Sequence, residues 1–193
     1  MNAIERHRRT KETDVRVKLF FEGSGTTSLS TGIGFLDHML DAMGRHGRLD
    51  LEVAAKGDLH VDPHHTVEDV ALTIGEAIRE GLGDARGIRR FGHAYVPMDE
   101  ALARAVWDLG GRPWPEVRLN LQLHHLGGVS CHDWRHFFQS LAISSRAALH
   151  VDVLRGEHDH HRLEAAFKAT GLALRQALEV VGSGVPSTKG MIA

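Results

Sequence analysis

The sequence predicts an α+β fold in which two copies of a β-β-α-β-α unit form one sandwich of sheets and helices. A repeated motif leads to this prediction, because "HHTVE" at 64–68 and "HHRLE" at 160–164 share the pattern His-His-x-x-Glu. Strand-type and helix-type periodicity also follow the same order in both halves. We expect residues 1–90 to form the first half, and residues 91–193 the second half with a C-terminal tail. Together they would make one compact domain.

Single residues outside the repeated motif recur at similar offsets. Gly23 matches Gly111 at an offset of 88 residues, and His38 matches His136 at an offset of 98. Small insertions account for the drift between these offsets. Internal duplication is therefore the main organising feature of the chain.

Periodicity predicts the elements of the first half. Residues 14–20 alternate apolar and polar side chains, as a half-buried strand does. Leu36, Met39, Leu40 and Met43 have helical spacing. In chain order we expect a strand, a turn, a return strand, a helix, a strand and a long helix, at 14–20, 22–25, 26–31, 35–47, 49–58 and 66–82.

The second half repeats this order. It is predicted to contain a strand with its turn, a strictly alternating strand, a helix, a strand and a long helix, at 101–113, 116–125, 136–149, 150–157 and 160–178. The tail from Gly182 onward lacks periodicity, which predicts a loop.

Composition excludes several classes of function. The formal net charge of -2 gives no general attraction to nucleic acid. No apolar run approaches the roughly 20 residues that span a bilayer, and the polar N-terminus lacks the apolar segment of a secretory signal. The single cysteine, Cys131, suits a reducing compartment. We therefore expect a cytoplasmic protein that binds neither nucleic acid nor membranes.

Histidine is unusually frequent, with 15 residues in short clusters. Neighbours on a helix diverge by about 100°, so adjacent histidines cannot easily bind one ion and suggest two. The candidate ligands are six imidazoles and two carboxylates: His38, His64, His65, Glu68, His136, His160, His161 and Glu164. This donor set leaves manganese, iron and zinc open. An isolated pair of histidines is usually a solvated or capping feature, but matched repetition of three residues argues against that here.

Basic residues form a second set. Arg90, Arg112, Lys168 and Lys189, with Ser187 as a further donor, are the groups that bind a phosphate oxyanion. Each alone could be an ordinary surface charge. The chain lacks the glycine-rich patterns of nucleotide-binding loops.

Eight motifs in order carry a resemblance that covers essentially the whole chain: "GFLDHML", "HHTVEDVALTIG", "GIRRFG", "PMDEAL", "DLGGRP", "HFFQSLA", "HHRLEAAFKA" and "PSTKG". The chain resembles the imidazoleglycerol-phosphate dehydratase family. The resemblance implies a carbon–oxygen lyase that converts imidazole glycerol phosphate to imidazole acetol phosphate and water in histidine biosynthesis. It also implies two Mn²⁺ per subunit and a homo-oligomer of 24 subunits with metal sites at subunit interfaces.

The same resemblance implies the ligands of each ion. One set is His64, His136, His160 and Glu164, and the other is His38, His65, Glu68 and His161. Each ion would thus draw on both halves of the duplication. Because these sites form between subunits, we expect that the ligands of one chain do not all meet.

The resemblance further implies a mechanism. Metal ions on both ring nitrogens would favour the imidazolate, which expels the hydroxyl through a diazafulvene-like intermediate. Glu12 matches an acid/base carboxylate that also contacts substrate, and the metal ligands His65, Glu68, His161 and Glu164 surround the reacting atoms. Arg90, Arg112, Lys168, Ser187 and Lys189 match the phosphate-binding residues, with His46 lining the site. Ala42 departs from the glutamine that is common in the family, and Asp99 matches an aspartate of less certain role.

Two other functions use the same residues. A metal-storage shell would need the histidines but not the phosphate-type set. A dinuclear hydrolase would need ions about 3.5–4 Å apart with a shared carboxylate, whereas here each ion has its own glutamate.

Overall fold

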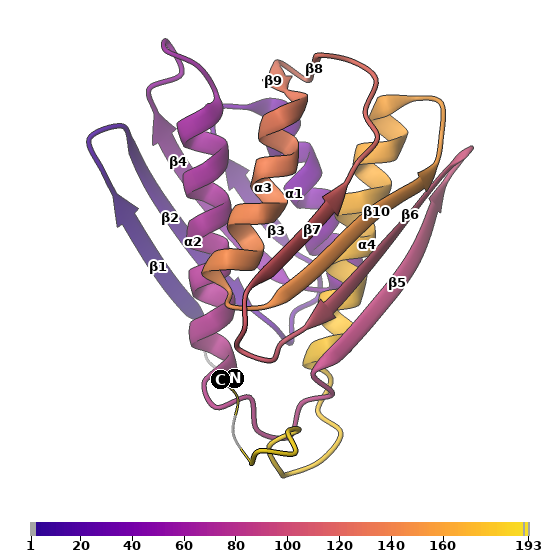
Figure 1. Ribbon diagram of the computed structural model, residues 1–193. Helices are drawn as coiled ribbons and strands as arrows, with labels where there is room; N and C mark the ends of the chain where they lie inside the picture. Colours follow the sequence, from indigo (N-terminus) through magenta and orange to yellow (C-terminus); the bar gives the residue numbers. More distant parts are fainter. Residues whose placement is uncertain (1–2, 191, 193) are drawn as a thin grey trace.

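The computed structural model describes residues 3–190 and 192. Two four-stranded sheets enclose four helices (Figure 1). The first half supplies β1 (Ile4–Arg9), β2 (Thr13–Phe20), β3 (Thr27–Ser30), α1 (Gly34–Gly47), β4 (Asp50–Gly57) and α2 (His64–Leu82). The second half supplies β5 (Phe91–Met98), β6 (Ala101–Asp108), β7 (Trp114–Arg118), β8 (His125–Leu126), β9 (Val129–Ser130), α3 (Cys131–Ser144), β10 (Ala148–Arg155) and α4 (Asp159–Leu178).

The two sheets have the same topology, which confirms the predicted α+β fold with internal duplication. The strand order is β1-β2-β4-β3 in one sheet and β5-β6-β10-β7 in the other. In both sheets the third strand of the half runs parallel to its neighbour, and the other pairs are antiparallel. We propose that the two halves of the duplication meet between residues 90 and 91, in the segment between α2 and β5.

Each four-stranded sheet contains one strand more than predicted, its first strand, and the second half also contains the short hairpin of β8 and β9. β1 reads IERHRR and β5 contains Pro97, and both lie at the edge of their sheet. Edge strands are half solvated and tolerate charge and proline. Their sequences therefore lack the apolar alternation by which strands are recognised.

The strand predicted at 116–125 and the helix predicted at 136–149 have different bounds in the structure. β7 ends at Arg118 because Asn120 takes a left-handed conformation (φ 53°), and the backbone N–H groups of Gln122 and Leu123 donate to the Asp159 carboxylate instead of a strand. α3 begins at Cys131, where the Ser130 side chain accepts a hydrogen bond from the His132 N–H. Such an N-cap satisfies a backbone donor that the helix cannot.

The helices form the layer between the sheets. α1 and α2 cover the first sheet, α3 and α4 cover the second, and α1 packs on α4 as α2 packs on α3. Buried aromatic side chains fill the second half of this core: Trp107, Trp134, Phe137, Phe138 and Phe167. Gly75 and Gly171, at matching positions of α2 and α4, allow the closest helix approaches, because an added Cβ would overlap Ser144 and the Met43 carbonyl respectively.

Strand register gives residue-by-residue equivalence between the halves. The pair Phe20–Asp50 in the first sheet corresponds to Asp108–Ala148 in the second. β2 and β6 therefore match at an offset of 88 residues, whereas α2 and α4 match at an offset of 96, as His64 and His160 show.

The C-terminal tail follows α4 along the lower end of the molecule (Figure 1). It is tied to the segment before β5 by Gly87 N–H to the Gly184 carbonyl and by the Arg90 guanidinium to the Pro186 carbonyl. Within the described part of the chain, none of the helices combines the length and apolar character that a membrane crossing requires.

Candidate active site

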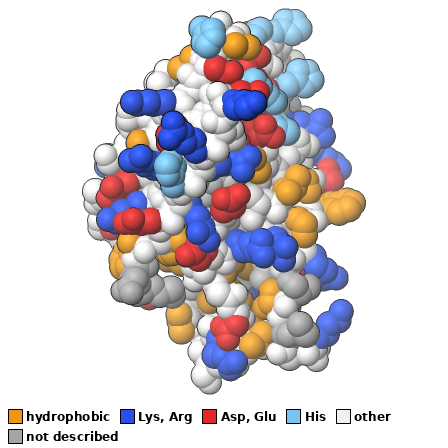
Figure 2. Space-filling view, turned by 90° about the vertical axis from the view of Figure 1, so that its left-hand side faces the viewer, with side chains coloured by type: hydrophobic (Ala, Val, Ile, Leu, Met, Phe, Trp, Pro, Cys, Tyr) orange, Lys and Arg blue, Asp and Glu red, His pale blue; other side chains and the backbone are white. Residues whose placement is uncertain are grey.

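Histidine side chains gather at one end of the molecule, the upper end in Figure 2. His64 and His65 are the first two residues of α2, and His160 and His161 lie in the first turn of α4. The His-His-x-x-Glu motif therefore starts each long helix. The short helices α1 and α3 bring His38 and His136 to the same end.

The first cluster consists of His64, Glu68 and His136, whose ligand atoms lie within 4.8 Å of one another. His136 Nε2 lies 3.0 Å from Glu68 Oε1, and His64 Nε2 lies 3.9 Å from Glu68 Oε2. The rings of His64 and His136 stack with centroids 5.2 Å apart. One turn of α2 thus meets α3 of the other half.

The second cluster consists of His38, His160 and Glu164 and mirrors the first. Glu164 Oε2 lies 3.1 Å from His38 Nε2 and 3.0 Å from His160 Nε2. Lys168 Nζ lies 2.7 Å from the other oxygen of this buried carboxylate. Here α4 supplies the His and Glu, and α1 of the other half supplies the second histidine.

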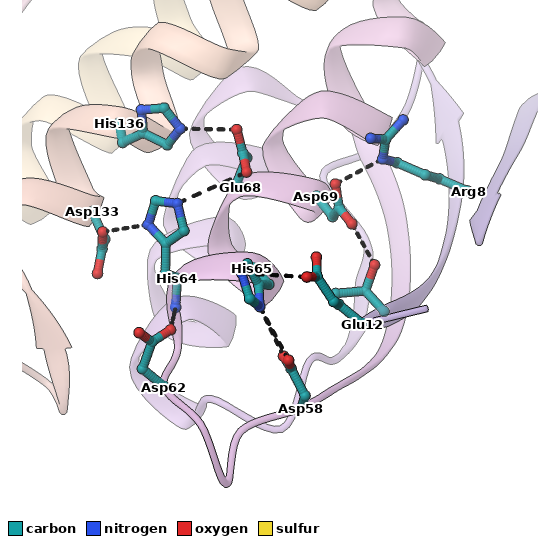
Figure 3. Close-up of polar contacts among 11 residues, drawn as sticks. Arg8, Glu12, Asp58, Asp62, His64, His65, Glu68, Asp69, Asp133 and His136 are labelled. Carbon is teal, nitrogen blue, oxygen red and sulfur yellow. Dashed lines mark hydrogen bonds and ion pairs between the residues drawn. The ribbon is translucent and has the colours of Figure 1, made fainter. Parts of the chain in front are cut away.

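His65 and His161 lie outside both clusters, each between two carboxylates. His65 Nδ1 contacts Asp58 at 3.1 Å, and its Nε2 lies 3.8 Å from Glu12 Oε1 (Figure 3). His161 Nδ1 contacts Glu100 at 2.8 Å, and its Nε2 lies 3.8 Å from Asp99. Adjacent rings of each motif therefore turn to different partners, as expected for neighbours on a helix.

Three histidines share an arrangement that suits metal ligation. Carboxylates bind the Nδ1 atoms of His64, His65 and His161, and these carboxylates are Asp133, Asp58 and Glu100. A carboxylate on Nδ1 orients the ring and leaves Nε2 for an ion, which is how metal-binding histidines are usually held. Sequence reasoning missed all three acids. Glu100 could have been found as the counterpart of Glu12 at the offset of 88, whereas nothing in the sequence marks Asp58 or Asp133.

The carboxylates set the electrostatics of the cluster. The hydrogen bonds that His64, His65 and His161 donate to Asp133, Asp58 and Glu100 respectively raise the pKa of these three histidines above 6.5. The backbone N–H of His158, the ring of His161 and the backbone N–H of Glu157 hold the pKa of Glu100 well below its ordinary range. Each of these carboxylates therefore favours the protonated form of the imidazole that it contacts when no metal ion is bound.

Glu164 is kept ionised in spite of its burial. Burial acts to raise the pKa of this carboxyl, but the hydrogen bond and charge of Lys168 and the contact with His160 lower it overall. An ionised, buried carboxylate between two imidazoles is a suitable ligand for a divalent cation.

The structure does not assemble either predicted four-ligand set within one chain. The first cluster combines His64 and His136 of one set with Glu68 of the other, and the second combines His160 and Glu164 with His38. If each metal site forms between two subunits, its four ligands come from two chains. The ligands of one set then do not need to meet within a single chain.

Four of the predicted phosphate-binding residues lie together. Arg90, Arg112, Ser187 and Lys189 line a cavity of about 280 Å³ beneath the C-terminal tail. Asp108 fixes the Arg90 guanidinium through hydrogen bonds of 2.7 and 3.1 Å. The cavity therefore presents cations from the segment before β5, the turn after β6 and the tail.

Lys168 and His46 lie elsewhere, close to Glu164. Lys168 bonds to that carboxylate, and burial together with the Lys168 charge lowers the pKa of His46. Ala42 lies one turn from both His38 and His46 on α1 and is buried. Asp99 has a left-handed backbone (φ 47°) in the turn between β5 and β6.

The cavity lined by Arg90, Arg112, Ser187 and Lys189 lies at the opposite end of the molecule from the two His/Glu clusters. Fourteen residues of α4 separate Glu164 from Leu178, which corresponds to roughly 21 Å along the helix axis. Figure 1 shows the same separation between the start of α4 and the tail that follows it. A larger hollow, of about 460 Å³, lies over the outer face of the first sheet, and it contains none of the predicted site residues.

Known proteins identify the family. The sequence model described as "Imidazoleglycerol-phosphate dehydratase" matches residues 31–174. The chain belongs to the imidazoleglycerol-phosphate dehydratase family. Among its relatives, the dehydratase of Methanothermobacter thermautotrophicus is 55% identical over 185 residues, covering 96% of this chain and 95% of the relative. The dehydratase of Bordetella petrii is 49% identical over 195 residues, with both chains fully covered.

Solved structures agree with this assignment. The dehydratase of Staphylococcus aureus superposes with a TM-score of 0.84 at 33% identity, covering 93% of this chain and 100% of that one. The enzyme of Pyrococcus furiosus, in complex with (S)-C348, also gives a TM-score of 0.84, at 38% identity and with coverage of 96% and 99%.

Membership confirms the predicted family, the predicted enzyme class and the predicted pathway. Members are hydro-lyases of histidine biosynthesis, and the dehydratase acts on a small phosphate compound. The groups of candidate ligands are consistent with a metal cofactor.

Proposed function

We propose that this dehydratase binds two Mn²⁺ per subunit and uses them to convert imidazole glycerol phosphate to imidazole acetol phosphate and water. The observation that carries the proposal is the pair of mirrored clusters, in which imidazole and carboxylate donors lie within 4.8 Å of one another. Further support comes from the carboxylates on Nδ1 of His64, His65 and His161. The donors fit a divalent cation, and their mixture of nitrogen and oxygen fits manganese.

Eight residues would hold the ions in two sets of four. The sets are His64, His136, His160 and Glu164, and His38, His65, Glu68 and His161. When bound, the ions would act as Lewis acids that stabilise negative charge on the imidazole ring of the substrate. Of these ligands, His65, Glu68, His161 and Glu164 would surround the reacting atoms of the substrate.

Glu12 would carry the proton. Its side chain is 54% exposed and lies 3.8 Å from His65 Nε2. Asp58 already holds the Nδ1 atom of His65, so the Glu12 carboxylate does not have to orient the ring. A half-exposed carboxylate beside the substrate ring can accept a proton from carbon and return it to the departing hydroxyl.

The cavity beneath the tail would bind the substrate phosphate. Arg90, Arg112, Ser187 and Lys189 line it, and Asp108 fixes the direction in which Arg90 donates. Lys168 and His46 would complete this set from the cluster end of another subunit. Metal storage does not require a phosphate-binding cavity, so the presence of this cavity favours the enzymatic function over storage.

The separation of cavity and clusters supports an assembly with shared sites. A substrate of a few atoms' length cannot span the roughly 21 Å between Glu164 and the end of α4. We therefore propose that each active site combines the clusters and the cavity of different subunits, in a homo-oligomer of 24 subunits. One cysteine and the biosynthetic role favour a cytoplasmic location.

Metal analysis and complementation test the proposal. Chelation should abolish dehydration, Mn²⁺ should restore it, and the reloaded protein should hold two ions per subunit. A single ion that survives His38→Ala and His136→Ala would contradict the two-ion site. For the shared site, co-expression of His136→Ala subunits with Arg112→Ala/Lys189→Ala subunits should give more activity than either variant alone. No gain in the mixed assembly would contradict sharing.

A further inference from the structure

An ion pair and a hydroxyl group form a triad beneath the turn that carries Glu12, with two of its three members buried. Asp69 on α2 accepts a hydrogen bond of 2.7 Å from Arg8 Nε through one oxygen and a hydrogen bond from the Thr13 hydroxyl through the other (Figure 3). Asp69 and Thr13 are 5% and 4% exposed. The triad therefore joins the first residue of β2 and the edge strand β1 to the helix that carries His65 and Glu68.

The turn above the triad is closed by its own hydrogen bonds. Thr10 Oγ1 accepts from the backbone N–H groups of Glu12 (3.1 Å) and Thr13 (2.9 Å). The Glu12 carbonyl accepts from the N–H of Asp58, whose carboxylate holds His65. A displacement of Thr13 would therefore move Glu12 relative to His65.

The second half of the chain serves as an internal control. By strand register and helix position, Arg8, Thr13 and Asp69 correspond to Val96, Ala101 and Ala165. All three of these counterparts are apolar and buried, at 8%, 1% and 0% exposure. The same fold unit thus forms with three apolar residues where the first half has an ionic triad.

Stability does not explain the difference. The Arg8 side chain is 35% exposed, and partly exposed ion pairs contribute little to stability. Replacing a buried ion pair by packed apolar residues is often neutral or stabilising as well. The triad instead provides directional bonds, which apolar contacts do not. Directional bonds matter where the position of one group must be held closely.

We propose that Asp69, with Arg8 and Thr13, is a positioning group that holds the Glu12 carboxylate against the site. The inference rests on the proposed role of Glu12 as proton carrier. In the second half, Glu100 occupies the position of Glu12 but is held directly by the N–H groups of Glu157 and His158. These direct hydrogen bonds fix the Glu100 carboxylate without a triad below its turn.

The test transplants the second-half residues into the first half. The variant Arg8→Val/Thr13→Ala/Asp69→Ala keeps an apolar set that this fold unit already accommodates. We expect kcat to fall by roughly 10- to 100-fold, since a misplacement of about 1 Å can cost that much, with smaller changes in KM. Metal content and assembly should persist. Hydrogen exchange of the Glu12 and Thr13 amides should accelerate, while exchange in the turn between β5 and β6 stays unchanged.

A matched control removes a comparable ion pair elsewhere. Arg104 and Asp152 are 38% and 13% exposed at their side chains, against 35% and 8% for Arg8 and Asp69. Arg104→Val/Asp152→Ala should leave kcat unchanged. An equal loss of kcat in this control would mean that the triad acts through general stability, and would overturn the proposal.

Combination with Glu12→Gln separates this proposal from the proposed function. If the triad acts through Glu12, adding its three changes to Glu12→Gln should lower kcat no further, because coupled groups are not additive. Additive losses would overturn the positioning role while leaving Glu12 as the proton carrier. Full activity of Glu12→Gln alone would instead refute the role of Glu12. In that case accelerated amide exchange in the triple variant would still support the anchoring of the turn, and unchanged exchange would overturn it.

Discussion

Glu12 and Glu100 occupy the same position in the two halves but have different surroundings. Both precede the first residue of an eight-residue strand, β2 or β6. Glu100 accepts hydrogen bonds from two backbone N–H groups and from His161 Nδ1. Glu12 is half exposed, and Asp58 holds His65 Nδ1 in its place. Because Asp58 orients the His65 ring, Glu12, the proton carrier in our proposal, does not have to do so.

The turns that follow β2 and β6 also carry equivalent residues with different surroundings. In the first half, the Asp50 carboxylate accepts hydrogen bonds from the N–H groups of Ser24, Gly25 and Thr26, so the first residue of β4 holds the turn. In the second half, Arg112 replaces the counterpart Ser24 and lines the cavity beneath the tail. In our proposal both halves supply metal ligands, whereas Glu12 and Arg112 each take a role that the counterpart in the other half, Glu100 or Ser24, does not share.

Glu12→Gln compared with Glu100→Gln tests the first contrast and should give the largest effect. Removing the proton carrier should lower kcat by about 10²–10⁴-fold with metal content unchanged. Glu100→Gln should instead weaken metal binding by about 10–100-fold, and excess Mn²⁺ should restore turnover. Steady-state kinetics and metal titration on both variants measure this. Similar behaviour of the two variants would remove the distinction between the halves.

Arg112→Ser, which copies the first-half residue, tests the second contrast. Loss of one charge-assisted hydrogen bond costs about 1.5–3 kcal/mol, so KM should rise roughly 10- to 100-fold. Lys189→Ala and deletion of the residues after Gly184 should act similarly. Ser24→Ala is the control and should leave KM unchanged. Equal binding of an azole phosphonate to intact and truncated proteins would exclude the tail from the site.

Gly75→Ala compared with Gly171→Ala tests the packing of the two long helices. Overpacking costs about 1–3 kcal/mol of unfolding free energy. Gly171→Ala should lie at the upper end of this range, because its Cβ would come within 2.2 Å of the Met43 carbonyl oxygen. At Gly75 the Ser144 hydroxyl can rotate away, and the nearest backbone atom, the Leu141 carbonyl oxygen, would lie 2.8 Å from the new Cβ. Gly182→Ala, with open space around it, should cost little. Denaturant unfolding of the metal-free proteins gives the order, and a reversed order would refute this account of the interface.

Lowering the pH should favour the folded state of the metal-free protein but weaken the metal binding that stabilises the loaded protein. The folded-state pKa values of His64, His65 and His161 are raised above 6.5 by their carboxylates. In the metal-free chain these pairs stabilise the fold below pH 6.5, and the stabilisation is lost as pH rises through the raised values. Metal binding needs the neutral ring, so affinity should fall as pH drops through the same range. Melting curves with and without Mn²⁺ between pH 5.5 and 8 test both signs. A metal affinity independent of pH would contradict the assignment of these ligands.

Much of the fold and of the candidate site could be predicted from local patterns. The spacing of His64, His65 and Glu68 and its repeat at 160–164 are visible in one turn of helix each. Periodicity located α1, α2, β4 and α4 to within two residues. The edge strands β1 and β5 could not be found in this way, because solvent contact on one side relaxes the apolar alternation.

The sequence by itself determined the donor types, the duplication and the family, since residue identity, spacing and order suffice for these. The tertiary structure decided which donors meet, because contacts between helices of different halves depend on packing. His136 joins Glu68, and His38 joins Glu164, across α2–α3 and α1–α4 contacts that no local pattern encodes. It also decided that Asp58, Asp133 and Glu100 face imidazole rings. A carboxylate becomes a partner through position in space, and residues as far apart as His64 and Asp133 acquire that position only when the chain folds.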